Sequence, residues 1–376
     1  MKSLKNIAGL GCLLLVGFGF FSCEKKDTPD PFVQPTVYSD LNFLENSKDQ
    51  RAVLAQLEGV VSEIEKCEKI DSTTTYSKLI ALYMAGGPTL SEIGTPYFDS
   101  KIKAPNAWLQ KAANASGKTY NPLDSNGTGG VYGAYLFDES GLDLAELVEK
   151  TMFGSVIYKH SLDLLSGPIS LKTADQLVAI YGANPTFPNT STSKTLAPDI
   201  FLAKYAARRD KNDGTGLYTN LKLNLIKLKT AVGKGEKFNK ERDEAASAIK
   251  SNLEKAMAAS VINYCKTVQS NLSKTDLKDT EKASALHSLT EAIGFTLGLR
   301  GIPQDRKKIS DAEIDEILSY FNYSESVKPT TYRFVLKPLI ELPKLNQAIT
   351  KLKSIYGFTE TELNDFSKNW IVEQGR

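Results

Sequence analysis

Residues 241–272 form the longest helix-forming stretch of the chain and read ERDEAASAIKSNLEKAMAASVINYCKTVQSNL. The stretch is rich in alanine, the residue with the highest helix propensity. It therefore predicts one long helix, and it limits the chain to folds in which helices of this length can be accommodated.

Several other segments carry apolar residues at helical spacing. Residues 49–70 place one apolar stripe on a helix, made of Val53, Leu57, Val60, Ile64 and Cys67. Residues 140–165, 310–321 and 360–374 are also predicted to be helical, the first with a cap near Ser140. Ser310 and Glu313 have the spacing of a capping box at the start of the second of these helices.

Evidence for strands is weak, because no alternating run of useful length and no hairpin dipeptide between apolar segments is found. Two long loops are predicted instead, at residues 118–133 and 181–199, and loops of this length are often functional. Arg208 and Arg209 are expected at a solvated helix end, with anion binding as the alternative. The fold predicted is all-α, a multi-helix bundle with long loops.

The N-terminus has the composition of an export signal. Lys2 and Lys5 precede an apolar run from Ile7 to Phe21, which is short for a membrane span. Ser22 and Cys23 follow, and a small residue before a cysteine at this position is typical of lipoprotein processing. We therefore expect residues 1–22 to be a lipoprotein signal peptide and Cys23 to carry the lipid. The alternative is an ordinary secretory signal with an unrelated cysteine.

The remaining chain divides into a tether and a domain. Residues 23–37 contain three prolines without periodicity, which predicts a flexible tether. Residues 38–376 are expected to form the helical domain, with 38–183 and 198–376 as candidate repeated halves. Several acyl chains anchor a protein stably. The predicted location is therefore the outer membrane, on the lipid anchor, with the cell exterior as the candidate face.

The net charge bears on the class of partner, and the cysteine content bears on disulfide formation. The chain has 46 basic and 44 acidic residues, and loss of Lys2 and Lys5 with the signal leaves no net charge. Nucleic acid is therefore not an expected partner. Cys67 and Cys265 remain after processing, and they form either one disulfide or two buried free thiols.

The chain has two histidines, and both begin a His-Ser-Leu triplet. His160 has Asp163 three residues later, and His287 has Glu291 four residues later, so each pair shares one helix face. Imidazole and carboxylate groups on facing helices are common metal ligands in bundles. These four residues are therefore candidate ligands for iron or zinc, and the alternative is two hydrogen-bonded histidines. No zinc-protease helix, P-loop or nucleophile-elbow motif is present.

Three segments resemble a family of exported lipoproteins of the Bacteroides type, known as domain of unknown function number 4856. They are YLFDESGLDLAELVEKTMFGSVIYKH, FLAKYAARRD and LHSLTEAIGFTLGLRGIPQDRKKISDAEIDEIL. The resemblance covers most of residues 38–376. Asp71, Ser72 and Thr73 resemble the O-glycosylation acceptor of such exported proteins, which makes Ser72 a candidate modification site.

The layout is more distantly similar to the imelysin-like proteins, helical bundles linked to iron uptake and once described as peptidases. Their motif is G-x-H-x-x-E, whereas here Ala285 replaces the glycine before His287 and Glu291 follows one position late. At the other histidine, Asp163 has the right spacing but Tyr158 replaces the glycine.

These resemblances imply a membrane-anchored module that binds a small ligand or a surface protein, in iron or nutrient acquisition. The first alternative is a metal-dependent hydrolase of imelysin-like type. The second is a structural component of a surface complex.

Overall fold

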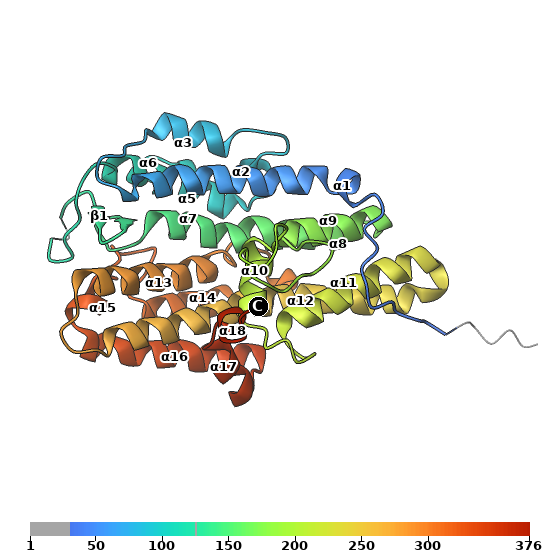
Figure 1. Cartoon of the computed structure of the whole chain (residues 1–376). Coiled ribbons are helices and arrows are strands. Elements are labelled where there is room, and N and C mark those ends of the chain that lie inside the picture. The colour runs from blue at the N-terminus through green and yellow to red at the C-terminus, as the bar shows by residue number, and fades with distance from the viewer. Residues whose placement is uncertain (1–30, 125) are drawn as a thin grey trace, which may run out of the picture. The chain divides into compact units, whose positions relative to one another are not determined.

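The computed structural model describes residues 31–124 and 126–376, and residues 34–376 form one compact unit (Figure 1). This unit begins at Gln34, a few residues before the domain boundary predicted from the sequence. The predicted signal peptide and Cys23 lie outside the described residues. Among the residues described, no helix has the length and apolar character needed to cross a membrane.

Helices dominate the first part of the unit. They are α1 (Phe43–Asn46), α2 (Lys48–Glu65), η1 (Lys66–Glu68), α3 (Tyr76–Tyr83), α4 (Leu90–Ile93), α5 (Pro96–Lys103), α6 (Trp108–Ala115), α7 (Leu144–Met152), η2 (Phe153–Tyr158), α8 (Lys159–Ser166) and α9 (Leu171–Tyr181). The strands β1 (Gly130–Tyr132) and β2 (Tyr135–Phe137) lie between α6 and α7.

The second part is also helical. It comprises α10 (Phe201–Arg208), α11 (Leu217–Lys234), η3 (Glu236–Phe238), α12 (Asn239–Leu272), α13 (Asp279–Leu297), η4 (Gln304–Arg306), α14 (Asp311–Tyr320), α15 (Arg333–Leu336), α16 (Pro338–Tyr356), α17 (Glu360–Phe366) and α18 (Trp370–Glu373). The all-α prediction is confirmed, and the long Ala-rich segment is the single helix α12.

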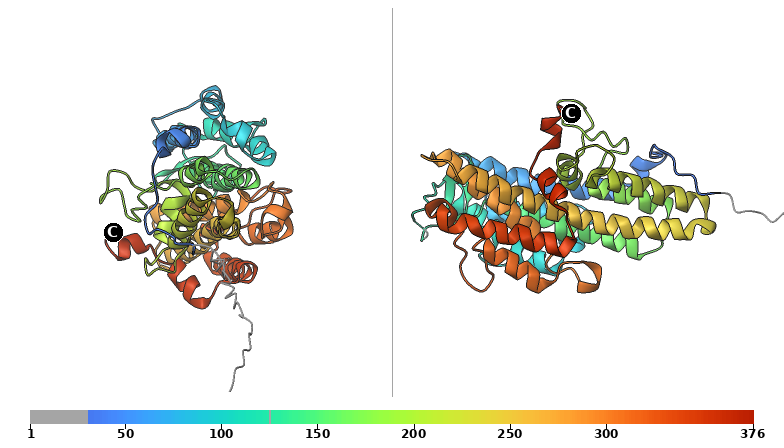
Figure 2. Two further views of the ribbon diagram at one scale, coloured as in Figure 1. Left: turned by 90° about the vertical axis from the view of Figure 1, so that its right-hand side faces the viewer. Right: turned by 90° about the horizontal axis from the view of Figure 1, so that it is seen from below.

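The long helices stack in layers (Figures 1 and 2). Helix α12 packs against α11, α13 and α16, while α13 packs against α7, and α7 in turn packs against α2. The middle layers are therefore covered on both sides, which explains why α7 and α13 are buried around most of their circumference. The interface between α7 and α13 matters most for the functional site.

Two glycines allow a close approach between η2, which continues α7, and the C-terminal end of α13. A Cβ atom on Gly154 would lie 2.2 Å from the backbone carbon of Gly298. Only glycine fits both positions, because a Cβ never approaches backbone this closely. Residues 153–158 of η2 are wound as a π-helix, and such segments frequently lie beside functional sites.

The caps confirm one sequence prediction and correct another. Ser310 and Glu313 form the predicted capping box of α14. The helix predicted to begin near Ser140 is α7, which begins at Leu144 and has Asp143 as its cap. The Oδ1 of Asp143 accepts hydrogen bonds from the backbone N–H groups of Ala145 and Glu146. Either residue type caps a helix well, so the sequence alone does not distinguish them.

A short hairpin occupies the end of the predicted loop 118–133 and continues beyond it. Strands β1 and β2 pair antiparallel, with Val131 opposite Leu136, and Gly133 in the connection has a φ of 62°. The expectation that this region lacks strands was wrong, because the two-residue turn Gly133-Ala134 was not recognised as a hairpin connection. The hairpin places Tyr135 beside α13.

The candidate disulfide is also corrected. Cys67 and Cys265 are both buried free thiols, the alternative left open by the sequence. Cys67 lies in η1, where its Sγ donates to the backbone oxygen of Glu63, and Cys265 lies within α12. Burial raises the pKa of both thiols, which makes them poor nucleophiles.

Candidate functional site: a buried cluster of carboxylates around His287

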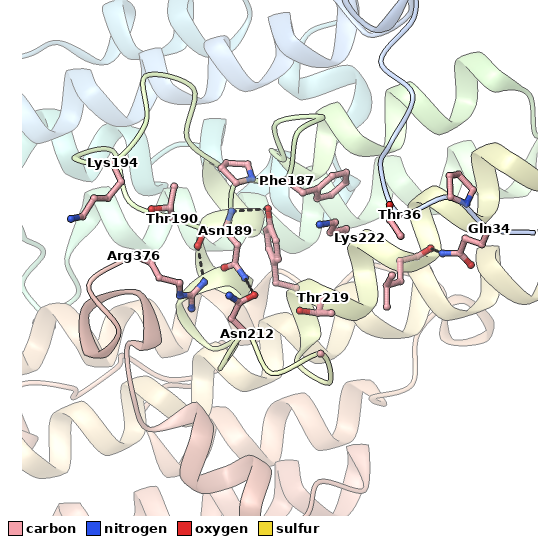
Figure 3. Close-up of a pocket in the computed structure, with 15 residues that line it drawn as sticks. Gln34, Thr36, Phe187, Asn189, Thr190, Lys194, Asn212, Thr219, Lys222 and Arg376 are labelled. Atoms are coloured by element: carbon pink, nitrogen blue, oxygen red, sulfur yellow. Dashed lines mark hydrogen bonds between the residues drawn. The ribbon is translucent and has the colours of Figure 1, made fainter.

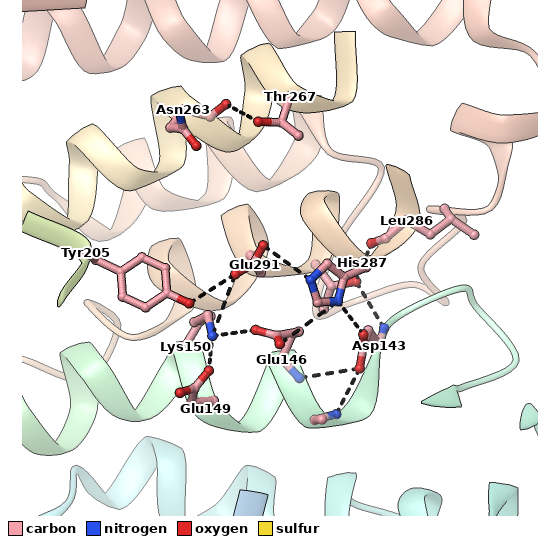
Figure 4. A network of polar contacts seen from close by, with 12 residues as sticks. Asp143, Glu146, Glu149, Lys150, Tyr205, Asn263, Thr267, Leu286, His287 and Glu291 are labelled. Atoms are coloured by element: carbon pink, nitrogen blue, oxygen red, sulfur yellow. Dashed lines mark hydrogen bonds and ion pairs between the residues drawn. The ribbon is translucent and has the colours of Figure 1, made fainter. Parts of the chain in front are cut away.

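The facing sides of α7 and α13 carry a cluster of ionisable side chains (Figure 4). We call it the His287 cluster, and its members are Asp143, Glu146, Glu149, Lys150, Tyr205, His287 and Glu291. Helical spacing explains the local geometry, since residues three or four apart on α7 or α13 lie on one face.

Asp143 fixes the orientation of the His287 ring. Its Oδ2 lies 2.8 Å from Nδ1 of His287, while its backbone N–H donates to Oγ1 of Thr290. The ring of Tyr135, from the hairpin, stacks on the imidazole with centroids 4.2 Å apart. Because Nδ1 is engaged by Asp143, Nε2 is the nitrogen left to face Glu291, whose Oε2 lies 3.6 Å away.

Two glutamates connect His287 to Lys150. Glu146 lies 2.5 Å from the Lys150 ammonium through Oε2 and 4.0 Å from Nδ1 of His287 through Oε1. Glu291 is arranged in the same way, because its Oε1 lies 3.6 Å from Lys150 and its Oε2 faces the imidazole. Each carboxylate therefore divides its two oxygens between the two cations.

Two further side chains complete the network. Glu149 also contacts the Lys150 ammonium, and the hydroxyl of Tyr205 donates to Oε1 of Glu291 at 3.3 Å. Four carboxylates thus surround one lysine and one histidine, and the Lys150 side chain is only 1% exposed. Buried charges of one sign in excess are costly unless a proton or another cation neutralises them.

The pKa values show this excess negative charge. Burial opposes protonation of His287, but the hydrogen bond to Asp143 and the charges of Asp143, Glu146 and Glu291 prevail and raise its pKa to about 9. Burial, followed by the charge of Glu146, raises the pKa of Glu291 to about 7. Near neutral pH His287 is therefore protonated, and Glu291 is protonated in part of the molecules.

Glu68 extends the excess of negative charge beyond the His287 cluster. Burial raises its pKa to about 8, and the charges of Asp143, Glu65 and Glu146 contribute in the same direction. Glu146 behaves differently, because the charges of Lys150 and His287 outweigh its burial and lower its pKa. The region as a whole carries more carboxylates than its own cations neutralise.

The donor set fits a divalent transition metal. Within the described residues, Glu146, His287 and Glu291 are the one group of His, Cys, Asp and Glu residues found with three ligand atoms within 4.8 Å of one another. The separation between Nε2 and Glu291 Oε2 suits two ligands that lie about 2.1 Å from one ion at a near-tetrahedral angle. Asp143 holds the other ring nitrogen, as is usual for a metal-bound histidine.

A small pocket reaches the cluster from the surface. It has a volume of about 180 Å³, and its lining includes Glu58, Glu65, Glu149, Lys204 and Tyr205. Glu149 and Tyr205 belong to the cluster and contact Lys150 and Glu291, respectively, so the pocket ends one side chain away from these two residues. Three carboxylates along this route favour the approach of a cation.

The structure separates the two histidines that the sequence paired as candidate ligands. His287 and Glu291 lie in the cluster, whereas His160 and Asp163 do not. Nε2 of His160 lies 3.1 Å from Nε2 of Gln50. Asp163 forms ion pairs with Lys159 and Arg306. The four-residue ligand set is therefore wrong in half of its members, because α8 does not face α13 at this point.

Sequence reasoning missed Asp143, Glu146, Glu149 and Lys150. The available signal was the segment DLAELVEK, which places acids and one lysine at three- and four-residue spacing just after a candidate cap. That pattern also describes an ordinary solvated helix face. Only the packing of α7 on α13 shows that this face is buried.

Two other predicted residues have clear positions. Ser72 is partly exposed in the segment between η1 and α3, and its proposed glycosylation stays a prediction. Arg209 is only 4% exposed, and its Nη1 donates to the backbone oxygen of Lys368. The expected solvated helix end is therefore wrong for Arg209, and burial lowers the pKa of this guanidinium to about 10.

Comparison with known proteins gives one finding. Residues 179–326 match the family model described as Domain of unknown function (DUF4856). The matched segment contains His287, Glu291 and Tyr205, whereas α7 with Asp143, Glu146 and Lys150 lies before it. Searches of curated proteins and of solved structures gave no match.

Proposed function

We infer that this protein is an exported, lipid-anchored module that binds a divalent transition metal, iron or zinc, at Glu146, His287 and Glu291. The observation that carries the proposal is the convergence of these three ligand atoms, together with Asp143 on the second ring nitrogen. Carboxylates that hold an imidazolium provide the negative charge that a dication requires.

Burial of the site favours binding over hydrolysis. The side chains of His287, Glu146 and Glu291 are 21%, 13% and 6% exposed. The pocket that ends at Glu149 and Tyr205, beside these three residues, holds about 180 Å³, less than the 300–1,000 Å³ or so of a typical substrate or ligand site. A metal ion fits this route, whereas a peptide does not.

The location of the protein follows from the sequence of its N-terminus. Acylation of Cys23 after removal of residues 1–22 would hold the helical unit at the outer membrane. The resemblance of the two histidine segments to the imelysin-like motif, which is incomplete at both, is the ground for proposing iron as the metal and acquisition as the role. The partner that we propose for the anchored module is a surface protein.

The test is metal content with a matched pair of histidine variants. The full chain is purified in detergent, stripped with a chelator, loaded with Zn²⁺ or Fe²⁺, and measured by mass spectrometry. Wild type and His160→Ala are expected to hold one ion per chain. His287→Ala loses a ligand and is expected to bind at least about 100-fold more weakly.

A folding control keeps the result clear. Glu291→Gln retains shape but not charge, and its circular dichroism and unfolding curve show whether the fold is intact. If wild type binds no stoichiometric metal, or if His287→Ala and Glu291→Gln bind as tightly as wild type, the proposed site is wrong.

A further inference from the structure

A second pocket lies apart from the His287 cluster (Figure 3). It has a volume of about 890 Å³, which lies in the range of small-molecule sites. Four separate parts of the chain build it: the segment 34–36, the loop 187–194, the start of α11 with the loop before it, and Arg376. It therefore uses part of the predicted loop 181–199, and loops of this length are often functional.

The lining of this pocket is cationic. Three of its residues are basic, namely Lys194, Lys222 and Arg376, and its lining includes no Asp or Glu. Within the described chain, no ion pair is found for Lys194 or Lys222. The three cations come from three separate parts of the chain, which are the loop 187–194, α11 and Arg376, and all three line the same pocket.

Two nearby carboxylates are used to build the wall. Asp199 accepts hydrogen bonds from the backbone N–H groups of Asn184 and Asn189 and from the hydroxyl of Tyr218. Asp210 accepts from the backbone N–H groups of Asn212 and Thr219. Their oxygens fix the loops in place, and the charge of Asp210 also acts on Arg376. Lys194 and Lys222 are therefore the lining cations without a carboxylate partner among the described residues.

The wall also contains buried polar atoms without partners. Arg376 donates from Nη1 to the backbone oxygen of Asn189 and from Nη2 to that of Asp210, but its Nε has no acceptor. Asn189 is 7% exposed, and its Oδ1 has no donor. Native proteins leave few such atoms unsatisfied, and each one calls for an explanation.

We propose that this pocket binds a small hydroxylated anion, the chemistry shared by sugar acids and sugar phosphates. The acidic group would pair with Lys222, Arg376 and Lys194, which together provide charge-assisted hydrogen bonds. Hydroxyl groups would meet the amide and hydroxyl side chains that line the pocket, namely Asn189, Asn212 and Thr219. A neutral sugar would leave the cations unpaired, and a large polyanion would not fit the volume.

Calorimetric titration of the full chain with four probes tests this proposal. The probes are D-glucuronate, glucose 6-phosphate, glucose and inorganic phosphate. Glucuronate or glucose 6-phosphate is expected to bind at least about tenfold more tightly than glucose, because only the anions form charge-assisted bonds. The tighter of the two shows whether a carboxylate or a phosphate is preferred. Inorganic phosphate is expected to bind more weakly than either.

Variants locate the binding. Lys222→Gln is expected to weaken the preferred probe about tenfold or more. Lys240→Gln, on the exposed surface of α12, is the matched control and is expected to leave affinity unchanged. Lys194→Gln provides a second reading if Lys222→Gln unfolds. Absence of binding by both sugar anions, equal affinity for glucose, equal or tighter binding of inorganic phosphate, or unchanged affinity in both pocket variants would each overturn the proposal.

Discussion

The two His-Ser-Leu segments have the same triplet and opposite surroundings. His160, in α8, contacts Gln50, and its acidic neighbour Asp163 pairs with Lys159 and Arg306. His287, in α13, meets carboxylates from another helix as well as its own. The comparison shows that the facing helix, and not the local sequence, decides which histidine can bind a metal.

The pKa values express the same difference. Burial lowers the pKa of His160, and the charge of Asp163 only partly opposes this effect. The pKa of His287 is raised to about 9 instead. Below its ordinary pKa near 6.5, His287 contributes its full stabilisation, which is lost as the pH rises through about 9. His160 contributes in the opposite direction and destabilises the fold as the pH falls.

The largest expected effect is the dependence of metal affinity on pH. A metal at His287 and Glu291 must displace the proton of His287 at neutral pH and a second proton, on Glu291, below about pH 7. The affinity for Zn²⁺ is therefore expected to rise about a thousandfold from pH 6 to pH 8, with a steeper slope below pH 7. Calorimetry in buffers of different ionisation enthalpy measures the protons released. A flat profile would show that neither residue is a ligand.

A matched pair of lysine variants gives the next largest effect. Lys150→Met leaves Glu146, Glu149 and Glu291 without their cation and is expected to lower the free energy of unfolding by about 3 kcal/mol. Lys159→Met breaks only the partly exposed pair with Asp163 and is expected to cost less than about 1 kcal/mol.

Metal is expected to narrow the difference in stability between the two lysine variants. Without the Lys150 ammonium, Glu146 and Glu291 have no competing cation, so Lys150→Met is expected to recover stability when Zn²⁺ is added, while Lys159→Met responds as wild type does. Urea unfolding with and without metal measures both. Equal losses in the two variants would contradict the assignment of Lys150 to the site.

The smallest expected effect on the metal site is that of His160→Ala. This change removes one contact with Gln50 and is expected to cost about 1 kcal/mol of stability, with no change in metal content. Chemical denaturation measures the first quantity, and the metal analysis measures the second. Loss of bound metal in this variant would show that His160 also contributes to the site.

The helical architecture and several details were predictable, because they depend on local spacing. The stripe from Val53 to Ile64, the Ser310 capping box and the pair His287–Glu291 all follow from residues three to four apart. Such relations survive in the fold because each is completed within one helix.

The rest of the site required contacts between distant segments. Asp143 lies 144 residues before His287, and no local pattern indicates that α7 faces α13. The close approach of Gly154 to Gly298 is likewise not indicated by any pattern in the sequence. The burial of Arg209 was missed for the same reason, since its acceptor belongs to Lys368, near the other end of the chain.

Asp143 limits how this chain can vary. One of its oxygens begins α7 and the other holds the His287 ring. Serine, threonine and asparagine cap helices about as well as aspartate, so the helix alone would accept any of them. None of these three residues can fully replace Asp143 beside the His287 imidazolium, because they carry no negative charge. A position that tolerates four residue types in most helices is thereby reduced to one, and a change there would alter the fold and the metal chemistry together.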